Sequence, residues 1–180
     1  MTARRGRATK KAPSVSIVVE EQRWRADPLA VRLMRKALRL ALAAAPHPDY
    51  APAGKTPAAV TILLAGDRRL RALNAFFRGK DKPTNVLSFS PGQEDAGYLG
   101  DVALGFGVVA REARAQRKSF AEHAAHLAIH GVLHLFGYDH EKANDAKLME
   151  ALEIALLQRL GIADPYRPRA YTKRRKKALK

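Results

Sequence analysis

The chain has 180 residues, of which 33 are Lys or Arg, 17 are Asp or Glu and 47% are hydrophobic, so it fits one globular domain with a hydrophobic core. No apolar run approaches the roughly 20 residues that cross a bilayer, and no apolar segment follows the N-terminal arginines, which excludes a transmembrane protein and a readable secretory signal. Without a span or a signal we expect a cytoplasmic protein. The absence of Cys excludes disulfides, iron-sulfur clusters and thiol nucleophiles, so we expect any metal to be held by His and carboxylates.

The net charge of +16 is concentrated at the two ends of the chain. Residues 1–12 carry five cations and residues 167–180 carry eight, neither with an acid, whereas residues 13–166 carry 20 cations against 17 acids. We therefore expect two disordered basic arms flanking a single folded domain, because such arms repel themselves and cannot pack. Nucleic acid fits these arms better than anionic lipid, since neither has an amphipathic apolar face; arms that only aid solubility are the alternative.

Hydrophobic patterning over the first half of the chain predicts two strands and two helices. β-Branched residues alternate in the first strand, and Asp27 followed by Pro28 is typical of a helix start. A proline-rich loop that includes His47 ends this helix, and Asp67 can cap the next one. The predicted elements are a strand over 14–20, a helix over 28–44, a strand over 58–65 and a helix over 67–77.

The second half of the chain adds two strands, spaced as hairpin partners, and three helices. Ser119 and Glu122 form a capping-box pattern before a helix that Gly137 ends, and Gly161 ends the last helix. The predicted strands cover 85–90 and 98–106, and the helices cover 108–117, 119–136 and 143–160. This order of elements predicts an α+β fold, a small mixed sheet of about four strands packed with about five helices.

Five of the six histidines lie between residues 123 and 140. Residues four apart on a helix are about 6 Å apart along its axis and can share an ion, so His130 can pair with either His126 or His134. Gly137 favours His134, because it can turn the chain back and bring His140 toward the same ion. We therefore expect His130, His134 and His140 to bind one metal ion.

The segment H-G-V-L-H-L-F-G-Y-D-H, residues 130–140, matches the metzincin peptidase pattern H-E-x-x-H-x-x-G-x-x-H at its three histidines and its glycine. Gly131 stands where those peptidases have the Glu that acts as general base. Three neutral imidazoles with an open fourth position suit a catalytic zinc ion. The sequence thus predicts a metzincin-like His helix without the peptidase base, in a catalytic metallohydrolase domain over residues 13–166.

Other polar residues have more than one interpretation. His123 and His126 could support the metal ligands, face the substrate or lie exposed, and Asp139 could orient an imidazole or cap a turn. In the segment R-G-K-D-K-P-T, residues 78–84, the planar guanidinium of Arg78 could bind a phosphate. A solvated basic loop is the alternative for this segment.

Three blocks of the sequence resemble the bacterial YbeY endoribonucleases, which are single-strand-specific metalloenzymes of ribosomal RNA maturation. They are L-N-A-F-F-R-G-K-D-K-P-T-N-V-L-S-F at 73–89, L-G-D-V at 99–102 and H-L-A-I-H-G-V-L-H-L-F-G-Y-D-H at 126–140. M-E-A-L-E at 149–153 and D-P-Y at 164–166 are also similar to the family. The resemblance is good over residues 57–166, loose before them, and leaves out the basic arms.

The resemblance implies one Zn²⁺ ion on His130, His134 and His140 and a catalytic role for Arg78. It also implies maturation of the 3′ end of the small-subunit ribosomal RNA, quality control of defective ribosomes, and contact with small-subunit proteins or an Era-type GTPase, with no role at a membrane. Zinc would activate water or polarise a phosphate oxygen while Arg78 holds the phosphate. Both water and the RNA 2′-hydroxyl stay open as the nucleophile.

Two other functions fit the same residues. A non-catalytic ribosome assembly factor, in which zinc organises the fold, would also lack a general base. A zinc metallopeptidase would need a base from elsewhere, such as Glu122 or Asp139.

Overall fold

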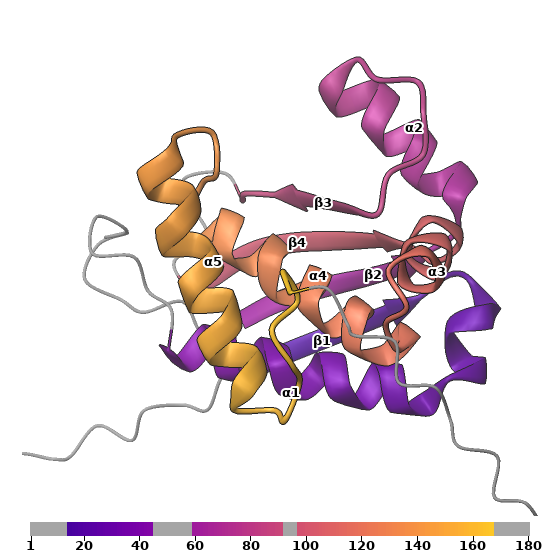
Figure 1. The fold of residues 1–180 in the computed structure, drawn as a ribbon. Helices are drawn as coiled ribbons and strands as arrows, with labels where there is room; N and C mark the ends of the chain where they lie inside the picture. Colours follow the sequence, from indigo (N-terminus) through magenta and orange to yellow (C-terminus); the bar gives the residue numbers. More distant parts are fainter. Residues whose placement is uncertain (1–13, 45–58, 92–96, 168–180) are drawn as a thin grey trace, which may run out of the picture.

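Four strands form one mixed β-sheet in the order β1-β2-β4-β3, in a computed structural model that describes residues 14–44, 59–91 and 97–167. The first three strands of this order run parallel, and β3 pairs antiparallel with β4 at the sheet edge, which confirms the predicted hairpin pairing (Figure 1). The strands are β1 (Ser14–Val19), β2 (Ala59–Ala65), β3 (Val86–Phe89) and β4 (Tyr98–Gly105). The expected basic arms, apart from Arg167, and His47 lie outside the described residues.

Five α-helices and one short 3₁₀ helix accompany the sheet in the described part of the chain. They are η1 (Gln22–Ala26), α1 (Pro28–Ala44), α2 (Asp67–Arg78), α3 (Phe106–Ala115), α4 (Phe120–Leu135) and α5 (Ala143–Gln158). The predicted α+β class, with four strands and five helices, is confirmed; η1 is an addition that the sequence patterning did not predict. None of the helices in the described ranges combines the length and apolar character needed to cross a membrane.

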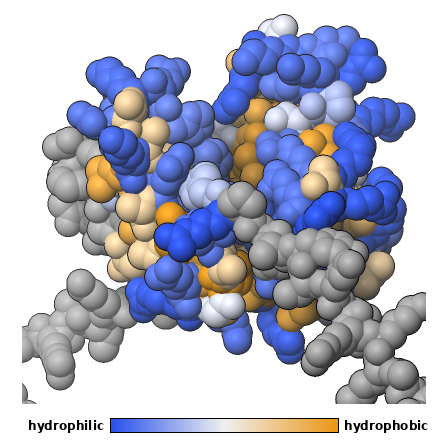
Figure 2. Space-filling view, in the orientation of Figure 1, coloured by the Kyte–Doolittle hydropathy of each residue, from blue (hydrophilic) through white to orange (hydrophobic). Residues whose placement is uncertain are grey.

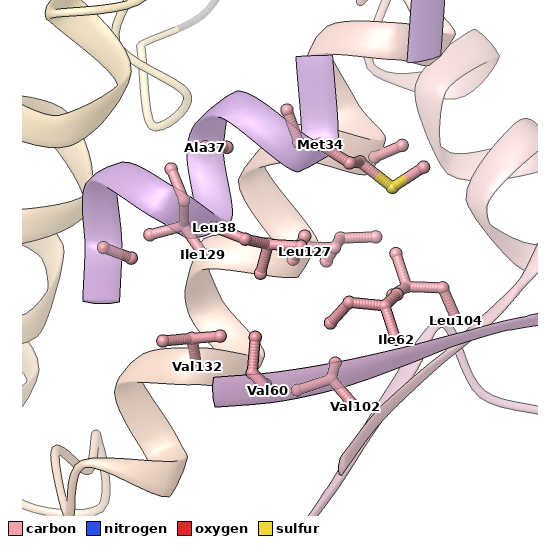
Figure 3. Packing of buried hydrophobic residues seen from close by; sticks show 14 of the residues in the cluster. Met34, Ala37, Leu38, Val60, Ile62, Val102, Leu104, Leu127, Ile129 and Val132 are labelled. Atoms are coloured by element: carbon pink, nitrogen blue, oxygen red, sulfur yellow. The ribbon is translucent and has the colours of Figure 1, made fainter. Parts of the chain in front are cut away.

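The hydrophobic core lies between the sheet and the helices α1 and α4. Figure 3 shows Leu38 of α1 and Leu127 of α4 above Val60 and Val102 of the sheet. Helix α2 covers the opposite face over a smaller cluster of Ala65, Leu70, Leu87 and Ala103. Because α4 is buried against both α1 and the sheet, its side chains are held in fixed positions.

The predicted starts of α1 and α4 differ in whether the predicted side-chain cap is formed. Asp27 caps α1 as predicted, since its Oδ1 accepts from the Ala30 N–H at 3.0 Å. Ser119 stands at the N-cap position of α4, but its side chain makes no capping hydrogen bond, so the serine half of the predicted capping box is not formed. The Ser119 carbonyl instead accepts the first helical bond, from the His123 N–H at 3.0 Å.

The prediction that Asp67 caps its own helix is wrong. Asp67 is the first residue of α2, and its carboxylate accepts from the Val108 N–H at 3.0 Å and from Arg111 at 2.9 Å. The negative charge therefore lies at the N-terminus of α3, where the helix dipole favours it. This contact accompanies a start of α3 at Phe106, earlier than the predicted start at Val108.

Candidate metal centre

Helix α4 and the turn after it bring three histidine rings together. His130 and His134 lie one turn apart on α4, and their Nε2 atoms are 3.1 Å apart. Gly137 has a φ of +88°, the left-handed conformation that ends a helix and turns the chain back. The centroid of the His140 ring is consequently 5.5 Å from that of His130 and 5.0 Å from that of His134.

The three rings have the arrangement that a single metal ion needs. One ligand nitrogen from each ring lies within 4.8 Å of the other two. Two nitrogens bound to one tetrahedral zinc ion lie roughly 3.3 Å apart, and the Nε2 atoms of His130 and His134 come close to that separation. A donor set of three imidazoles also suits zinc.

Hydrogen bonds on the other side of two rings fix which nitrogen is available. His130 Nδ1 lies 2.8 Å from Glu153 Oε1, and His134 Nδ1 lies 3.0 Å from the Tyr138 carbonyl oxygen. Both partners accept, so each Nδ1 carries the proton and each Nε2 keeps its lone pair. The two Nε2 atoms, 3.1 Å apart, are therefore the nitrogens that one cation could bind together.

His134 is in the protonation state that metal binding requires. Burial, followed by the neighbouring His130 and His140, lowers the pKa of His134 from 6.5 to about 4. The ring is therefore neutral at pH 7 even before an ion binds. A metal ligand imidazole must be neutral, so little free energy is needed to deprotonate it.

Glu153 of α5 supports the trio and is not indicated by the histidine pattern. Its buried carboxylate accepts from His126 Nε2 at 2.7 Å, from His130 and from the Tyr166 hydroxyl. Burial raises its pKa, but the hydrogen bonds with His126 and His130 outweigh burial and lower the pKa to about 2. One sequence signal could have revealed it: this Glu shares the buried face of α5 with apolar residues, where a charge needs a partner.

Gly131 lies where α4 comes closest to the sheet. A Cβ atom there would lie 2.6 Å from Val102 Cγ1 and 3.1 Å from Ser88 Oγ. The Ser88 hydroxyl also donates to the Gly131 carbonyl at 2.9 Å, which holds the helix and β3 together. The general-base Glu of the peptidase pattern has no room at this position, because its side chain would enter the sheet.

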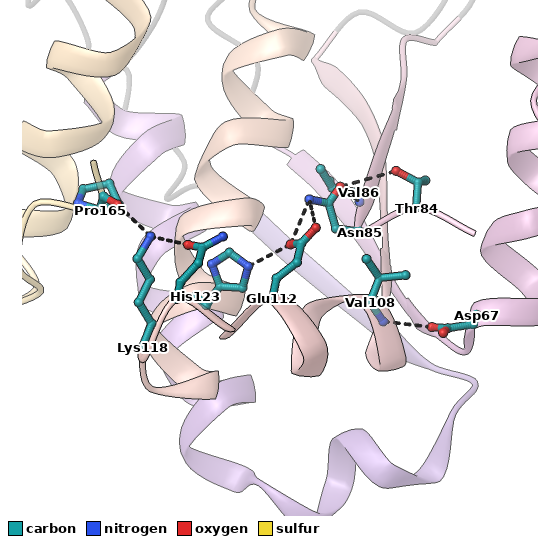
Figure 4. A network of polar contacts seen from close by, with 10 residues as sticks. Asp67, Thr84, Asn85, Val86, Val108, Glu112, Lys118, His123 and Pro165 are labelled. Atoms are coloured by element: carbon teal, nitrogen blue, oxygen red, sulfur yellow. Dashed lines mark hydrogen bonds and ion pairs between the residues drawn. The ribbon is translucent and has the colours of Figure 1, made fainter. Parts of the chain in front are cut away.

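A second polar network adjoins the trio along α4. His123 is only 3% exposed, and its Nε2 lies 2.9 Å from Glu112 of α3, which also accepts from Asn85 at 3.1 Å (Figure 4). Burial lowers the pKa of His123, although Glu112 opposes this. A cavity of about 360 Å³ extends from this network to His130. Of the interpretations left open for His123 and His126, exposure does not hold: each ring is largely buried and pairs with a carboxylate.

The remaining expected site residues lie at the surface. Asp139 Oδ1 accepts from the backbone N–H of His140 at 2.7 Å, which favours the turn-capping interpretation. Arg78 is the last residue of α2, is exposed, and is not among the described residues that line the cavity beside His130. The structure thus brings the three histidines together without showing Arg78 in contact with them, so the role of Arg78 stays a prediction.

Comparison with known proteins identifies relatives over most of the chain. A family model described as Endoribonuclease YbeY matches residues 20–161. A protein named Endoribonuclease YbeY from Maricaulis maris is 43% identical over 85% of this chain and 91% of its own length. Proteins of the same name from Gluconobacter oxydans and Bordetella pertussis are 47% and 45% identical, over 84% and 88% of this chain and 86% and 98% of their own.

A solved structure has a similar fold. The solution structure of TM1509 from Thermotoga maritima superposes with a TM-score of 0.54 at 27% sequence identity. The superposition covers 81% of this chain and 87% of that protein. The solved protein therefore shares the arrangement of sheet and helices described for this chain.

Proposed function

Because this chain belongs to the YbeY endoribonuclease family, we propose that it is a zinc-dependent endoribonuclease that cleaves single-stranded RNA. The observation that carries this proposal is the convergence of His130, His134 and His140 on one point. When bound there, zinc would supply a Lewis acid with an open coordination position, able to acidify water or polarise a phosphate oxygen. Residues 13–166 would form the catalytic domain.

The residues of the chain contribute by holding groups in place. Glu153 and the Tyr138 carbonyl keep the protons on Nδ1 of His130 and His134, so the two Nε2 lone pairs stay directed at the shared point. Arg78 would bind the scissile phosphate with its guanidinium and stabilise the negative charge that develops there. The cavity beside His130 offers space for the adjoining RNA.

We also propose the cellular task that the family resemblance implies. The chain would act in the cytoplasm on ribosomal RNA, at the 3′ end of the small-subunit RNA, and in the quality control of defective ribosomes. Small-subunit proteins and an Era-type GTPase would be its partners. The excess of positive charge supports an RNA substrate, because counterion release favours binding to a polyanion.

Cleavage of a labelled single-stranded RNA by the purified full chain tests the proposal. Activity should disappear with a chelator, return with added zinc, and be absent in His134→Ala. Arg78→Ala should lose activity while keeping its metal, whereas Arg68→Ala, an exposed arginine at the other end of α2, should behave as the unmodified chain. Full activity of the chelated protein or of His134→Ala would overturn the proposal.

The same variants separate the two alternatives left open by the sequence. A non-catalytic assembly factor would show no RNA cleavage, and Arg78→Ala would leave its cellular function intact while His140→Ala unfolds it. A metallopeptidase would digest casein in a reaction that His134→Ala abolishes. Metal analysis of each purified variant shows whether a lost activity reflects a lost ion.

A further inference from the structure

Two phenylalanine rings stand exposed at the C-terminal end of α2. Phe76 is 83% exposed and Phe77 is 58% exposed, and their ring centroids are 4.9 Å apart in an edge-to-face arrangement. Figure 2 shows hydrophobic surface just below the blue α2 region, facing the hollow between the α2 and α5 sides of the molecule. Two adjacent aromatic rings left in water offer flat apolar faces to a binding partner.

The protein holds this pair and the loop after it in one arrangement. The centroid of the Phe77 ring lies 4.8 Å from the centroid of the Phe89 ring in β3. Asn74, which is buried, donates to the Lys82 carbonyl at 2.8 Å and so fixes the loop to the helix. A bidentate pair adds a second attachment, with Arg71 donating to the two oxygens of Asp81 at 2.7 and 2.6 Å. Binding here would therefore require little ordering of the chain.

The surface around the two rings is positively charged. Arg78, Lys80 and Lys82 are all exposed, and none forms an ion pair with any residue in the described ranges. The one acid of this loop, Asp81, is already paired with Arg71. Two aromatic faces beside uncompensated cations complement a strand that presents flat bases and phosphates together.

Strand β3 connects the aromatic pair to the helix that carries the histidines. Phe89 of β3 contacts Phe77. The residue before Phe89 in the strand is Ser88, whose hydroxyl donates to the Gly131 carbonyl. Gly131 is the neighbour of His130 on α4. Side chains alternate across a strand, so β3 carries the aromatic pair on one face and the histidine helix on the other.

We propose that Phe76 and Phe77 form a stacking platform for the bases of single-stranded RNA, with Lys80 and Lys82 contacting its phosphates. This inference rests on the proposed function and names where the substrate strand outside the cleavage point binds. RNA is favoured over a protein segment because the exposed apolar area is only two rings wide and is bordered by cations that form no ion pair with any described residue. Base stacking tolerates any sequence, so the platform would bind strands without strong base preference.

Affinity of the full chain for two oligonucleotides tests the platform. One is 2′-O-methyl oligouridylate, and the other is a strand of equal length and charge without bases; electrophoresis checks that both stay intact. Phe76→Ala should weaken binding of oligouridylate about tenfold and leave binding of the abasic strand unchanged. Phe76→Trp should retain affinity, and Leu29→Ala, which removes a 52% exposed side chain from α1, should have no effect.

Each other outcome decides against the platform. Equal binding of oligouridylate by Phe76→Ala and the unmodified chain would show that no base stacks on this ring, which leaves a protein contact as the alternative use of the exposed pair. Equal losses on both strands would show that the ring does not act through base stacking, since the abasic strand has no base to stack, and failure of Phe76→Trp would also exclude stacking. The binding comparison stands apart from the proposed function: absence of RNA cleavage would refute the nuclease, while normal cleavage with unchanged Phe76→Ala affinity would refute only the platform.

Discussion

Among single residues, Glu153 has the largest part in organising the metal centre. Its buried carboxylate is one acceptor shared by His126, His130 and the Tyr166 hydroxyl, and it stays ionised because its histidine partners outweigh the cost of burial. A shared buried charge of this kind is strongly coupled to its partners, so removing it leaves several donors unsatisfied. The proposed metal ligand His130 depends on it for both its ring orientation and its proton position.

Glu153→Gln should lower zinc affinity about 10- to 100-fold, because the amide removes the negative charge and offers only one acceptor oxygen. Competition with a chromophoric chelator measures this affinity directly. Glu150→Gln is the matched control, since Glu150 is exposed on the same helix. Unchanged zinc affinity in Glu153→Gln would contradict the supporting role of this carboxylate.

Among the helices and strands, α4 is positioned by contacts that its own sequence pattern does not contain. Gly131 lets the helix approach the sheet, and the pair formed by His123 and Glu112 ties it to α3. Asn85, just before β3, donates to the same Glu112 carboxylate. The positions of the three proposed metal ligands therefore depend on how α3, α4 and β3 pack together.

Gly131→Ala should destabilise the protein by about 1–3 kcal/mol, because the added methyl overlaps Val102 Cγ1. The sign of the effect is informative, since Gly→Ala in an open helix position would stabilise by about 0.5–1 kcal/mol. Urea unfolding followed by circular dichroism gives the difference. A more stable variant would show that the sheet can yield at this point.

The pairing of α3 and α4 predicts a pH dependence of stability. Burial lowers the pKa of His123 below 6.5, whereas the ring titrates near 6.5 in the unfolded chain. Below about pH 6.5 the unfolded chain therefore binds a proton that the folded protein excludes, and the free energy of unfolding falls as the pH falls. Urea unfolding of the unmodified chain and of His123→Gln across this range should show a shallower decline in the variant; parallel declines would contradict it.

Across the whole molecule, most of the excess positive charge lies in residues 1–12 and 167–180, whereas cations and acids nearly balance in residues 13–166. The described residues end at Arg167, next to Tyr166, whose hydroxyl reaches Glu153. Lys118 also donates to the Pro165 carbonyl at 2.6 Å, which fixes this segment beside α4. Arg167, the first of the C-terminal basic residues, therefore follows a segment that is held against α4 and Glu153, and the basic residues after it would add affinity for a polyanion.

Deletion of residues 168–180, which removes seven cations, should weaken RNA binding and flatten its dependence on salt. For a single strand, the slope of log affinity against log salt should become shallower by about 0.7 for every phosphate that the shortened chain leaves without a cation. Zinc content should not change, because the deletion leaves Tyr166 and Glu153 in place. An unchanged slope would reject a role of this arm in RNA binding.

The order of the elements and the grouping of the histidines follow from the sequence alone, whereas several helix caps do not. Hydrophobic periodicity predicted the order and type of the strands and α-helices, and the spacing of His130, His134 and Gly137 indicated which rings converge. These features depend on residues within one or two helical turns, where geometry follows directly from spacing along the chain.

Which distant groups meet depends instead on the tertiary structure. Glu153 reaches His130 across 23 positions of sequence, and Asp67 caps a helix 41 positions later. The close approach of Gly131 to Val102 likewise depends on how α4 packs on the sheet. Such contacts are selected by the packing of whole elements, and no local pattern encodes the partner of a buried charge.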